Sequence, residues 1–164
     1  MDKKLLEELN LQIKKELYSA YLYLSMASYF DYINLEGFAT WMKVQAKEEF
    51  GHAMRIYDFL NDRGEKVILE GIEKPPSDFS SPKDVFEKTL KHEKEVTKSI
   101  ENLYKLAKEK NDYSTEIMLQ WFITEQVEEE KQANIILEKL KKIEDKPHLI
   151  LMLDKELSKR GEEK

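Results

Sequence analysis

The chain has 164 residues, a net charge of −6 at pH 7 and no cysteine. Charged residues make up 37% of the sequence and hydrophobic residues 41%, while glycine and proline number only 5 and 4. This length suits one domain with its own core, and this composition is typical of long helices. The lack of cysteine excludes disulfides, thiolate zinc sites and thiol nucleophiles. The acidic balance disfavours a nucleic-acid or anionic-membrane partner, and no stretch resembles a signal peptide or a membrane span, so we expect a cytoplasmic protein.

Four long segments have the periodicity of amphipathic helices, and a short fifth segment follows them. We predict helices over residues 3–33, 35–63, 82–110, 113–143 and 147–159, with a frayed tail from residue 160. Asn34, Ser81 and Asp112 can each accept hydrogen bonds as the N-cap of a helix. Pro82 suits a first helical position, and Gly64 suits the position just after a helix ends.

The connection between the second and third predicted helices, residues 64–81, is much longer than the others. Its eighteen residues reach up to ~60 Å when extended at ~3.3 Å per residue, whereas a helix of about 28 residues is ~42 Å long. The linker can therefore run the length of a bundle and make the second and third helices parallel. The predicted fold class is all-α: a four-helix bundle with one long crossover and a short C-terminal fifth helix. Val67, Ile68 and Leu69 in the linker predict a subunit contact.

Each of the four long helices carries one glutamate on the stripe that should face the bundle interior: Glu16, Glu49, Glu93 and Glu129. The members of each antiparallel pair lie at similar distances from their turn, and the crossover brings the two pairs to one level. A solvated helix face is the common explanation for any single glutamate, but it does not explain four inward acids together. No lysine or arginine lies on these stripes near that level. The acids are therefore either protonated or neutralised by a cation.

His52 follows Glu49 by three residues within 47-KEEFGHAMR-55, so both side chains can reach one metal ion. A single Glu-x-x-His pattern occurs often by chance. Together with the four acids it predicts a site for two divalent cations, whose positive charges balance four carboxylates. Carboxylates with one imidazole suit iron or manganese better than structural zinc. Gly51 weakens the helix here, so we expect a close helix contact behind the site.

At this point the sequence resembles the non-haem ferritins of bacteria and archaea, over essentially its whole length. The residues that carry the resemblance are Glu16 with Tyr23, 48-EEFGH-52, 92-HE-93 and 125-EQVEEE-130, together with the short fifth helix. The resemblance implies one ferritin-like di-iron domain over residues 1–160 and a flexible tail over residues 161–164. It implies a ferroxidase that oxidises Fe(II) with dioxygen or peroxide. The ferric mineral would be stored inside a hollow homo-oligomeric shell of 24 subunits.

The resemblance also implies which residues bind the two iron ions. Glu16, Glu49 and His52 would hold the first ion. Glu49 would bridge to the second ion, which Glu93 and Glu129 would hold.

Further residues take supporting roles in the family. Gln126 would form a hydrogen bond near the oxygen or metal position, and Tyr23 could donate an electron or a hydrogen bond beside the site. A third, more exposed iron site would be formed by Glu48, Glu125, Glu128 and Glu129.

Several related classes differ from this sequence. We expect no haem, because Phe50 follows Glu49 where bacterioferritins carry a methionine ligand. Gln126 and Glu129 stand where many di-iron bundles have a second Glu-x-x-His motif, and rubrerythrins need cysteines that are absent here. Two other functions stay open. A DNA-protecting mini-ferritin builds its iron site between subunits and lacks a fifth helix, and a metal-free helical interaction module leaves the four inward acids unexplained.

Overall fold

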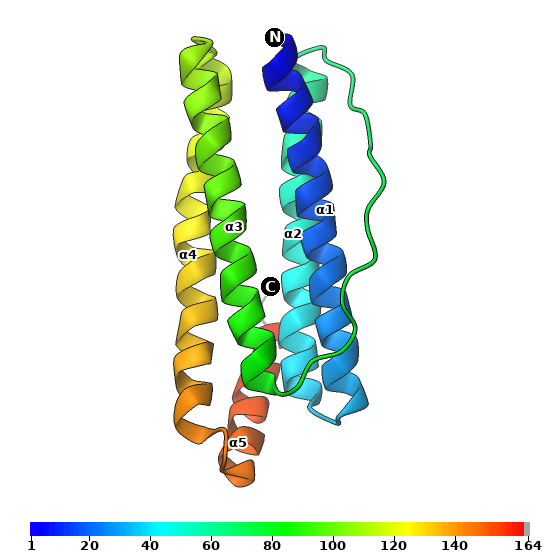
Figure 1. Cartoon of the computed structure of the whole chain (residues 1–164), viewed down its shortest axis with the longest axis vertical. Coiled ribbons are helices and arrows are strands. Elements are labelled where there is room, and N and C mark those ends of the chain that lie inside the picture. The colour runs from blue at the N-terminus through cyan, green and yellow to red at the C-terminus, as the bar shows by residue number, and fades with distance from the viewer. Residues whose placement is uncertain (163–164) are drawn as a thin grey trace.

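The computed structural model describes residues 1–162, which form five α-helices and a short 3-10 helix. The bounds are α1 (Lys3–Tyr32), α2 (Glu36–Asp62), α3 (Pro82–Glu109), α4 (Tyr113–Ile143), α5 (Pro147–Leu157) and the 3-10 helix η1 (Ser158–Glu162). The predicted fold class is confirmed: four long helices form a bundle, in which α1 packs mainly on α2 and α3 mainly on α4 (Figure 1). Within the described residues, no helix has the length and apolar character needed to cross a membrane.

Residues 64–81 connect α2 to α3 as an extended segment that runs along α1 from one end of the bundle to the other (Figure 1). The Ile68 N–H donates to Asn10 Oδ1 at 2.8 Å, and Ser25 Oγ donates to the Pro76 carbonyl at 2.6 Å. Asn10 and Ser25 are about 22 Å apart along α1 at 1.5 Å per residue, so the linker follows that helix closely. The linker makes α2 and α3 parallel, as its length predicts. Leu69 is 64% exposed, and the subunit contact predicted for this segment stays a prediction.

The side-chain caps explain where the helices of the second half begin. Ser81 Oγ accepts a hydrogen bond from the Asp84 N–H at the start of α3, and the Asp112 carboxylate accepts one from the Thr115 N–H at the start of α4. The N-cap predicted for the second helix was wrong. Leu35 occupies that position without a side-chain hydrogen bond, and Asn34 adopts a φ of 62° in the turn before it. Asparagine tolerates this left-handed conformation better than most residues do.

The interior of the bundle consists of two apolar clusters with a polar layer between them. The cluster at the α5 end contains Phe30 and Phe38, whose rings stack with centroids 4.9 Å apart. The cluster at the opposite end contains Ile56 and Phe122, both fully buried. The buried acids and His52 predicted from the sequence belong to neither cluster, whereas Tyr23 belongs to the cluster at the α5 end.

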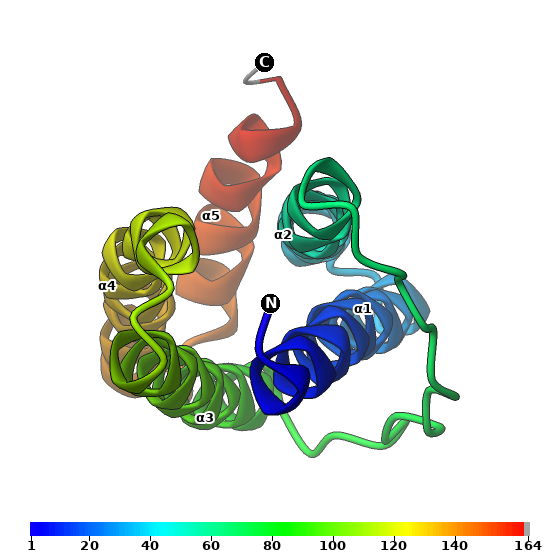
Figure 2. The same ribbon diagram turned by 90° about the horizontal axis from the view of Figure 1, so that it is seen from above.

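Helix α5 leaves the bundle between α2 and α4 (Figure 2). Gly37 is required where α5 crosses α2, because a Cβ atom there would lie 1.7 Å from the Asp154 carbonyl oxygen. The Phe38 N–H donates to Asp154 Oδ1 at 2.9 Å and fixes the same crossing. The fraying predicted from residue 160 was wrong for the described residues, since η1 continues the chain and Arg160 hydrogen-bonds to α2. Residues 163–164 of the predicted flexible tail lie outside the described residues.

Candidate metal centre

The four inward glutamates meet in the middle of the bundle, and each of the four long helices contributes one of them. Glu16, Glu49 and Glu93 are at most 1% exposed, and Glu129 is 6% exposed. His52 lies beside them and is 5% exposed. The helical repeat places each acid on the buried stripe of its helix, and the parallel crossover brings the two helix pairs to a common level. The layout predicted from the sequence is therefore present.

Two groups of potential ligands share Glu49. Ligand atoms of Glu16, Glu49 and His52 lie within 4.8 Å of one another, and so do carboxylate oxygens of Glu49, Glu93 and Glu129. Carboxylate and imidazole ligands lie about 2.0–2.2 Å from a bound transition-metal ion such as zinc, so groups this close can converge on one ion. Glu49 belongs to both groups and is placed to bridge two ions.

The half of the centre formed by α1 and α2 has an unused acceptor. Glu16 Oε2 is buried and has no hydrogen-bond partner among residues 1–162, while Glu16 Oε1 accepts from Gln12 Nε2 at 3.0 Å. His52 Nδ1 lies 3.2 Å from Glu49 Oε2 and 3.8 Å from Glu16 Oε2. A buried oxygen without a partner costs free energy, which a bound cation would recover. This half is therefore ready to receive a cation.

The half formed by α3 and α4 is held by hydrogen-bond donors instead. The Tyr23 hydroxyl donates to Glu93 Oε1, and Gln126 Nε2 donates to Glu93 Oε2 at 3.0 Å. Gln45 Nε2 donates to Glu129 Oε2 at 2.6 Å. Gln126 thus turns its nitrogen toward Glu93, and Tyr23 is fully buried beside the same carboxylate. Both residues orient a carboxylate at the centre.

Burial and crowding change the protonation of this layer. Burial, together with the charge of Glu93, raises the pKa of Glu49 well above its ordinary value, and the same two causes raise the pKa of Glu129 to about 8. Burial by itself would lower the pKa of His52, but the adjacent carboxylates of Glu16 and Glu49 raise that pKa to about 11. The metal-free centre therefore retains protons near neutral pH, and cations that bind there displace them.

The residues of the predicted third iron site are only partly assembled. One group with ligand atoms within 4.8 Å of each other contains His52, Glu125 and Glu129. Glu48 instead pairs with Arg160, with Oε2 and Nη2 2.8 Å apart, and Glu128 is exposed. In the described part of the chain, neither Glu48 nor Glu128 joins a group of potential ligands.

Two glutamines at the centre were not assigned a role from the sequence. Gln12 Nε2 donates to Glu16 and Gln45 Nε2 donates to Glu49, each at 3.0 Å. Each glutamine precedes its glutamate by four residues, which places the two side chains on the same helix face. This i, i+4 pairing is visible in the sequence and could have predicted both contacts.

Gly51 and His92 lie close in sequence to the proposed ligands but do not bind metal in the predicted arrangement. The close contact predicted behind Gly51 was wrong, because a Cβ atom there would meet no atom of residues 1–162 within 4 Å and the residue is exposed. His92 precedes Glu93 but belongs to no group of potential ligands in the described part of the chain. Its Nε2 lies 2.8 Å from Ser19 Oγ, and its ring packs edge-on against Tyr23, so it supports the centre from behind.

Known proteins share this four-helix bundle with one long crossover. A family model described as the ferritin-like domain matches residues 6–143. The chain belongs to the ferritin family. Among its relatives are bacterial non-heme ferritins of Staphylococcus epidermidis and Staphylococcus saprophyticus, each 41% identical over 161 residues. These alignments cover 98% of this chain and 97% and 96% of the two ferritins.

Solved structures give the same result. An open pore ferritin from the hyperthermophilic archaeon Archaeoglobus fulgidus is 51% identical and superposes with a TM-score of 0.96, covering 96% of this chain and 98% of that one. A humanized archaeal ferritin is 50% identical, with a TM-score of 0.95 and coverage of 96% and 97%. Membership in the ferritin family confirms the function predicted from the sequence, iron storage with ferroxidase activity.

Proposed function

We propose that Glu16, Glu49, His52, Glu93 and Glu129 form a di-iron ferroxidase centre within each chain. The observation that supports this most strongly is that two groups of potential ligands share Glu49. Glu16, Glu49 and His52 would hold one ferrous ion, and Glu49, Glu93 and Glu129 the other. Each ferrous ion gives up one electron, so one dioxygen that takes two electrons and two protons leaves as hydrogen peroxide. Hydrogen peroxide can itself accept two electrons in the same way.

The chain's own residues prepare the centre for this reaction. Protons leave Glu49, Glu129 and His52 when ferrous ions bind, because their raised pKa values keep them protonated in the iron-free chain. Tyr23 and Gln126 keep their hydrogen bonds to Glu93 and so fix the second half of the centre. Carboxylates stabilise the ferric product, and an all-carboxylate second half lets that product move on into the mineral.

A third iron would bind between Glu125 and Glu129, on the more exposed side of the centre. Glu125 is half-buried and its Oε1 lies 3.9 Å from His52 Nε2. Glu48 and Glu128 would join this ion only after their side chains move, because Glu48 is paired with Arg160 in this structure. This ion would mark the start of the route by which ferric iron leaves the centre.

We also propose that the chain assembles into a hollow shell of 24 subunits in the cytoplasm, with the mineral inside. The exposed apolar residues of the linker, Ile68, Leu69 and Ile72, supply a surface for such contacts. The lack of cysteine suits a reducing compartment. The mass of the particle tests this assembly, since a mini-ferritin shell has 12 subunits.

The centre is tested by adding Fe(II) to the iron-free protein in air and following the absorbance of the ferric product. We expect Glu49→Ala and His52→Ala to slow the initial rate on the order of 100-fold, because even residues that only orient ligands typically contribute 10–100-fold. Glu101→Ala removes an exposed carboxylate from α3 and serves as the control. Wild-type rates in both centre variants would show that the proposed site is wrong, and a purified protein that binds no metal would favour the interaction module.

A further inference from the structure

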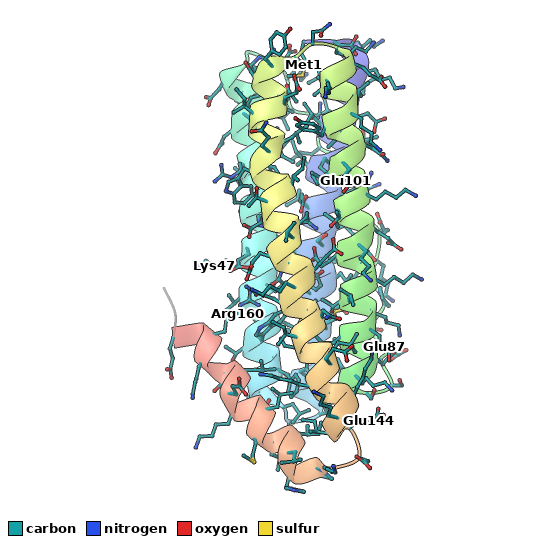
Figure 3. All side chains as sticks on the ribbon, turned by 90° about the vertical axis from the view of Figure 1, so that its left-hand side faces the viewer. Met1, Lys47, Glu87, Glu101, Glu144 and Arg160 are labelled. Atoms are coloured by element: carbon teal, nitrogen blue, oxygen red, sulfur yellow. The ribbon has the colours of Figure 1, made fainter. Side chains whose placement is uncertain are left out.

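Arg160 in η1 is held tightly against α2, at the edge of the polar layer (Figure 3). Its guanidinium lies over the Trp41 ring, 4.2 Å from the centroid, and its Nη1 donates to the Trp41 carbonyl at 3.2 Å. Its Nη2 donates to Gln45 Oε1 at 2.9 Å and to Glu48 Oε2 at 2.8 Å. Only 12% of its side-chain surface is exposed. An arginine with three acceptors and an aromatic ring has one fixed position.

The Gln45 amide connects Arg160 to the metal centre. Gln45 is 1% exposed, and its Nε2 donates both to Glu49 Oε1 at 3.0 Å and to Glu129 Oε2 at 2.6 Å. A continuous chain of hydrogen bonds thus runs from the C-terminal segment to one proposed bridging ligand and one ligand of the second ion.

Arg160 also determines which way the Gln45 amide points. A guanidinium can only donate hydrogen bonds, so it accepts no contact from the Gln45 nitrogen and must face the oxygen. With the oxygen directed at Arg160, the nitrogen must face Glu49 and Glu129. If Arg160 were absent, the amide could turn over and place its oxygen against the two carboxylates, which would repel them when they are charged.

We infer that Arg160 is a positioning residue of the metal centre, which acts through Gln45 to fix the carboxylates of Glu49 and Glu129. The C-terminal η1 segment then forms part of the centre as well as part of the fold. The inference rests on the proposed di-iron centre, because it assigns a role to residues that surround those ligands. Arg160 also neutralises Glu48, so the experiment must separate orientation from charge.

The variants are Arg160→Ala, Arg160→Lys, Gln45→Ala and the double variant Arg160→Ala with Gln45→Ala. Lys159→Ala is the matched control, because it removes one positive charge from an exposed position of the same 3-10 helix. Each iron-free protein is titrated with Co(II), whose visible absorption bands report ligand geometry. Fe(II) oxidation is then measured with KM and kcat determined separately, and the thermal midpoint is recorded for each protein.

We expect Arg160→Ala to change the Co(II) bands and to weaken metal binding on the order of tenfold, as for other groups that orient metal ligands. The double variant should be no weaker than Gln45→Ala, because both changes break the same chain of contacts. Arg160→Lys keeps the charge but not the fork of donors, so it should restore binding only in part. Lys159→Ala should behave as the wild type.

Three results would overturn the inference. Arg160→Ala could match Lys159→Ala in its Co(II) bands and KM, or Arg160→Lys could bind metal as tightly as the wild type. The third is a double variant whose loss of metal affinity equals the sum of the losses in Arg160→Ala and Gln45→Ala. Failure of the di-iron centre itself gives a different pattern. In that case wild-type protein would not bind Co(II), or Glu49→Ala would bind it as tightly as the wild type.

Discussion

The two apolar ends of the bundle differ sharply from the polar layer between them. At the α5 end, Phe30 and Phe38 stack in a cluster of buried apolar side chains. Further along the bundle, the same helices bury Glu16, Glu49 and His52, and the carboxylate of Glu16 has an oxygen without a hydrogen-bond partner among residues 1–162. Burying apolar surface stabilises the fold, whereas burying acids costs free energy unless they are protonated or bound to a cation. The ends therefore supply the stability that lets the middle remain ready for iron.

Removal of an aromatic ring from one apolar end tests most strongly whether stability and iron oxidation depend on different parts of the bundle. Phe38→Ala should lower the free energy of unfolding by about 3–5 kcal/mol, as expected for a fully buried phenylalanine. Its effect on iron oxidation should be small, because Phe38 lies eleven residues before Glu49, about 16 Å along α2. Chemical denaturation and the oxidation rate per folded protein measure the two effects.

Phe122→Ala is the matched comparison at the other end. The Phe122 ring is also fully buried, but it packs edge-on against His52 with centroids 6.0 Å apart. Phe122→Ala should lose a similar amount of stability. It should also slow oxidation, since the His52 imidazole loses the ring that packs against it and orients it. Equal slowing by Phe38→Ala and Phe122→Ala would contradict the separation of stability from function.

The polar layer should make the stability of the iron-free protein depend on pH. Burial and the charge of Glu93 raise the folded-state pKa of Glu129 from 4.5 to about 8. Between these two values the folded chain holds a proton that the unfolded chain has lost, so the stability of the iron-free protein should fall as pH rises. A tenfold difference in proton affinity between the folded and unfolded chains corresponds to about 1.4 kcal/mol. Because neighbouring acids share the protons, we expect a total change of roughly 2 kcal/mol between pH 5.5 and 8.5.

Glu129→Gln should remove much of this pH dependence and should make the iron-free protein more stable at pH 8.5. Unfolding free energies at the two pH values measure the effect, and Glu128→Gln is the control because Glu128 is exposed on the same helix. Saturating divalent metal should also remove the dependence in the wild type. An unchanged slope in Glu129→Gln would show that this carboxyl is ionised throughout the range.

The position of the four acids could be predicted because it depends on local rules. A repeat of three and four residues determines which side of a helix is buried, and the length of the linker determines that α2 and α3 are parallel. These two facts bring Glu16, Glu49, Glu93 and Glu129 to one level without knowledge of any other contact.

The contact of Arg160 with α2 could not be predicted in this way. Arg160 and Trp41 are separated by 119 positions, and their stacking depends on how α5 crosses α2 at Gly37. The sequence places Arg160 in a charged, glycine-containing stretch that has the composition of a frayed end. The prediction for Gly51 was wrong for a related reason. A glycine in a helix can mark a close neighbour, but here Gly37 and Gly161 have such a neighbour and Gly51 has none among residues 1–162.

The smallest expected effect is that of Tyr23→Phe, which removes one donor from the polar layer and leaves the ring in place. Burial and the charge of Glu93 raise the pKa of Tyr23 well above 10, so its hydroxyl stays protonated and donates to Glu93 at any working pH. A hydrogen bond to a charged group contributes about 1.5–3 kcal/mol to stability. In Tyr23→Phe, a metal ion bound to Glu93 would offset part of this loss. We expect oxidation to slow several-fold rather than 100-fold.

The same variant decides between the two roles of Tyr23. If the hydroxyl only orients Glu93, the number of ferrous ions oxidised per dioxygen should be the same in the wild type and in Tyr23→Phe. If Tyr23 also donates an electron, the wild type should show a tyrosyl radical signal in electron paramagnetic resonance after iron addition, and the variant should lack it. The T-shaped contact of Tyr23 with His92 places an imidazole next to that ring. His92→Phe would then change the lifetime of the radical but would leave the orienting role of the hydroxyl intact.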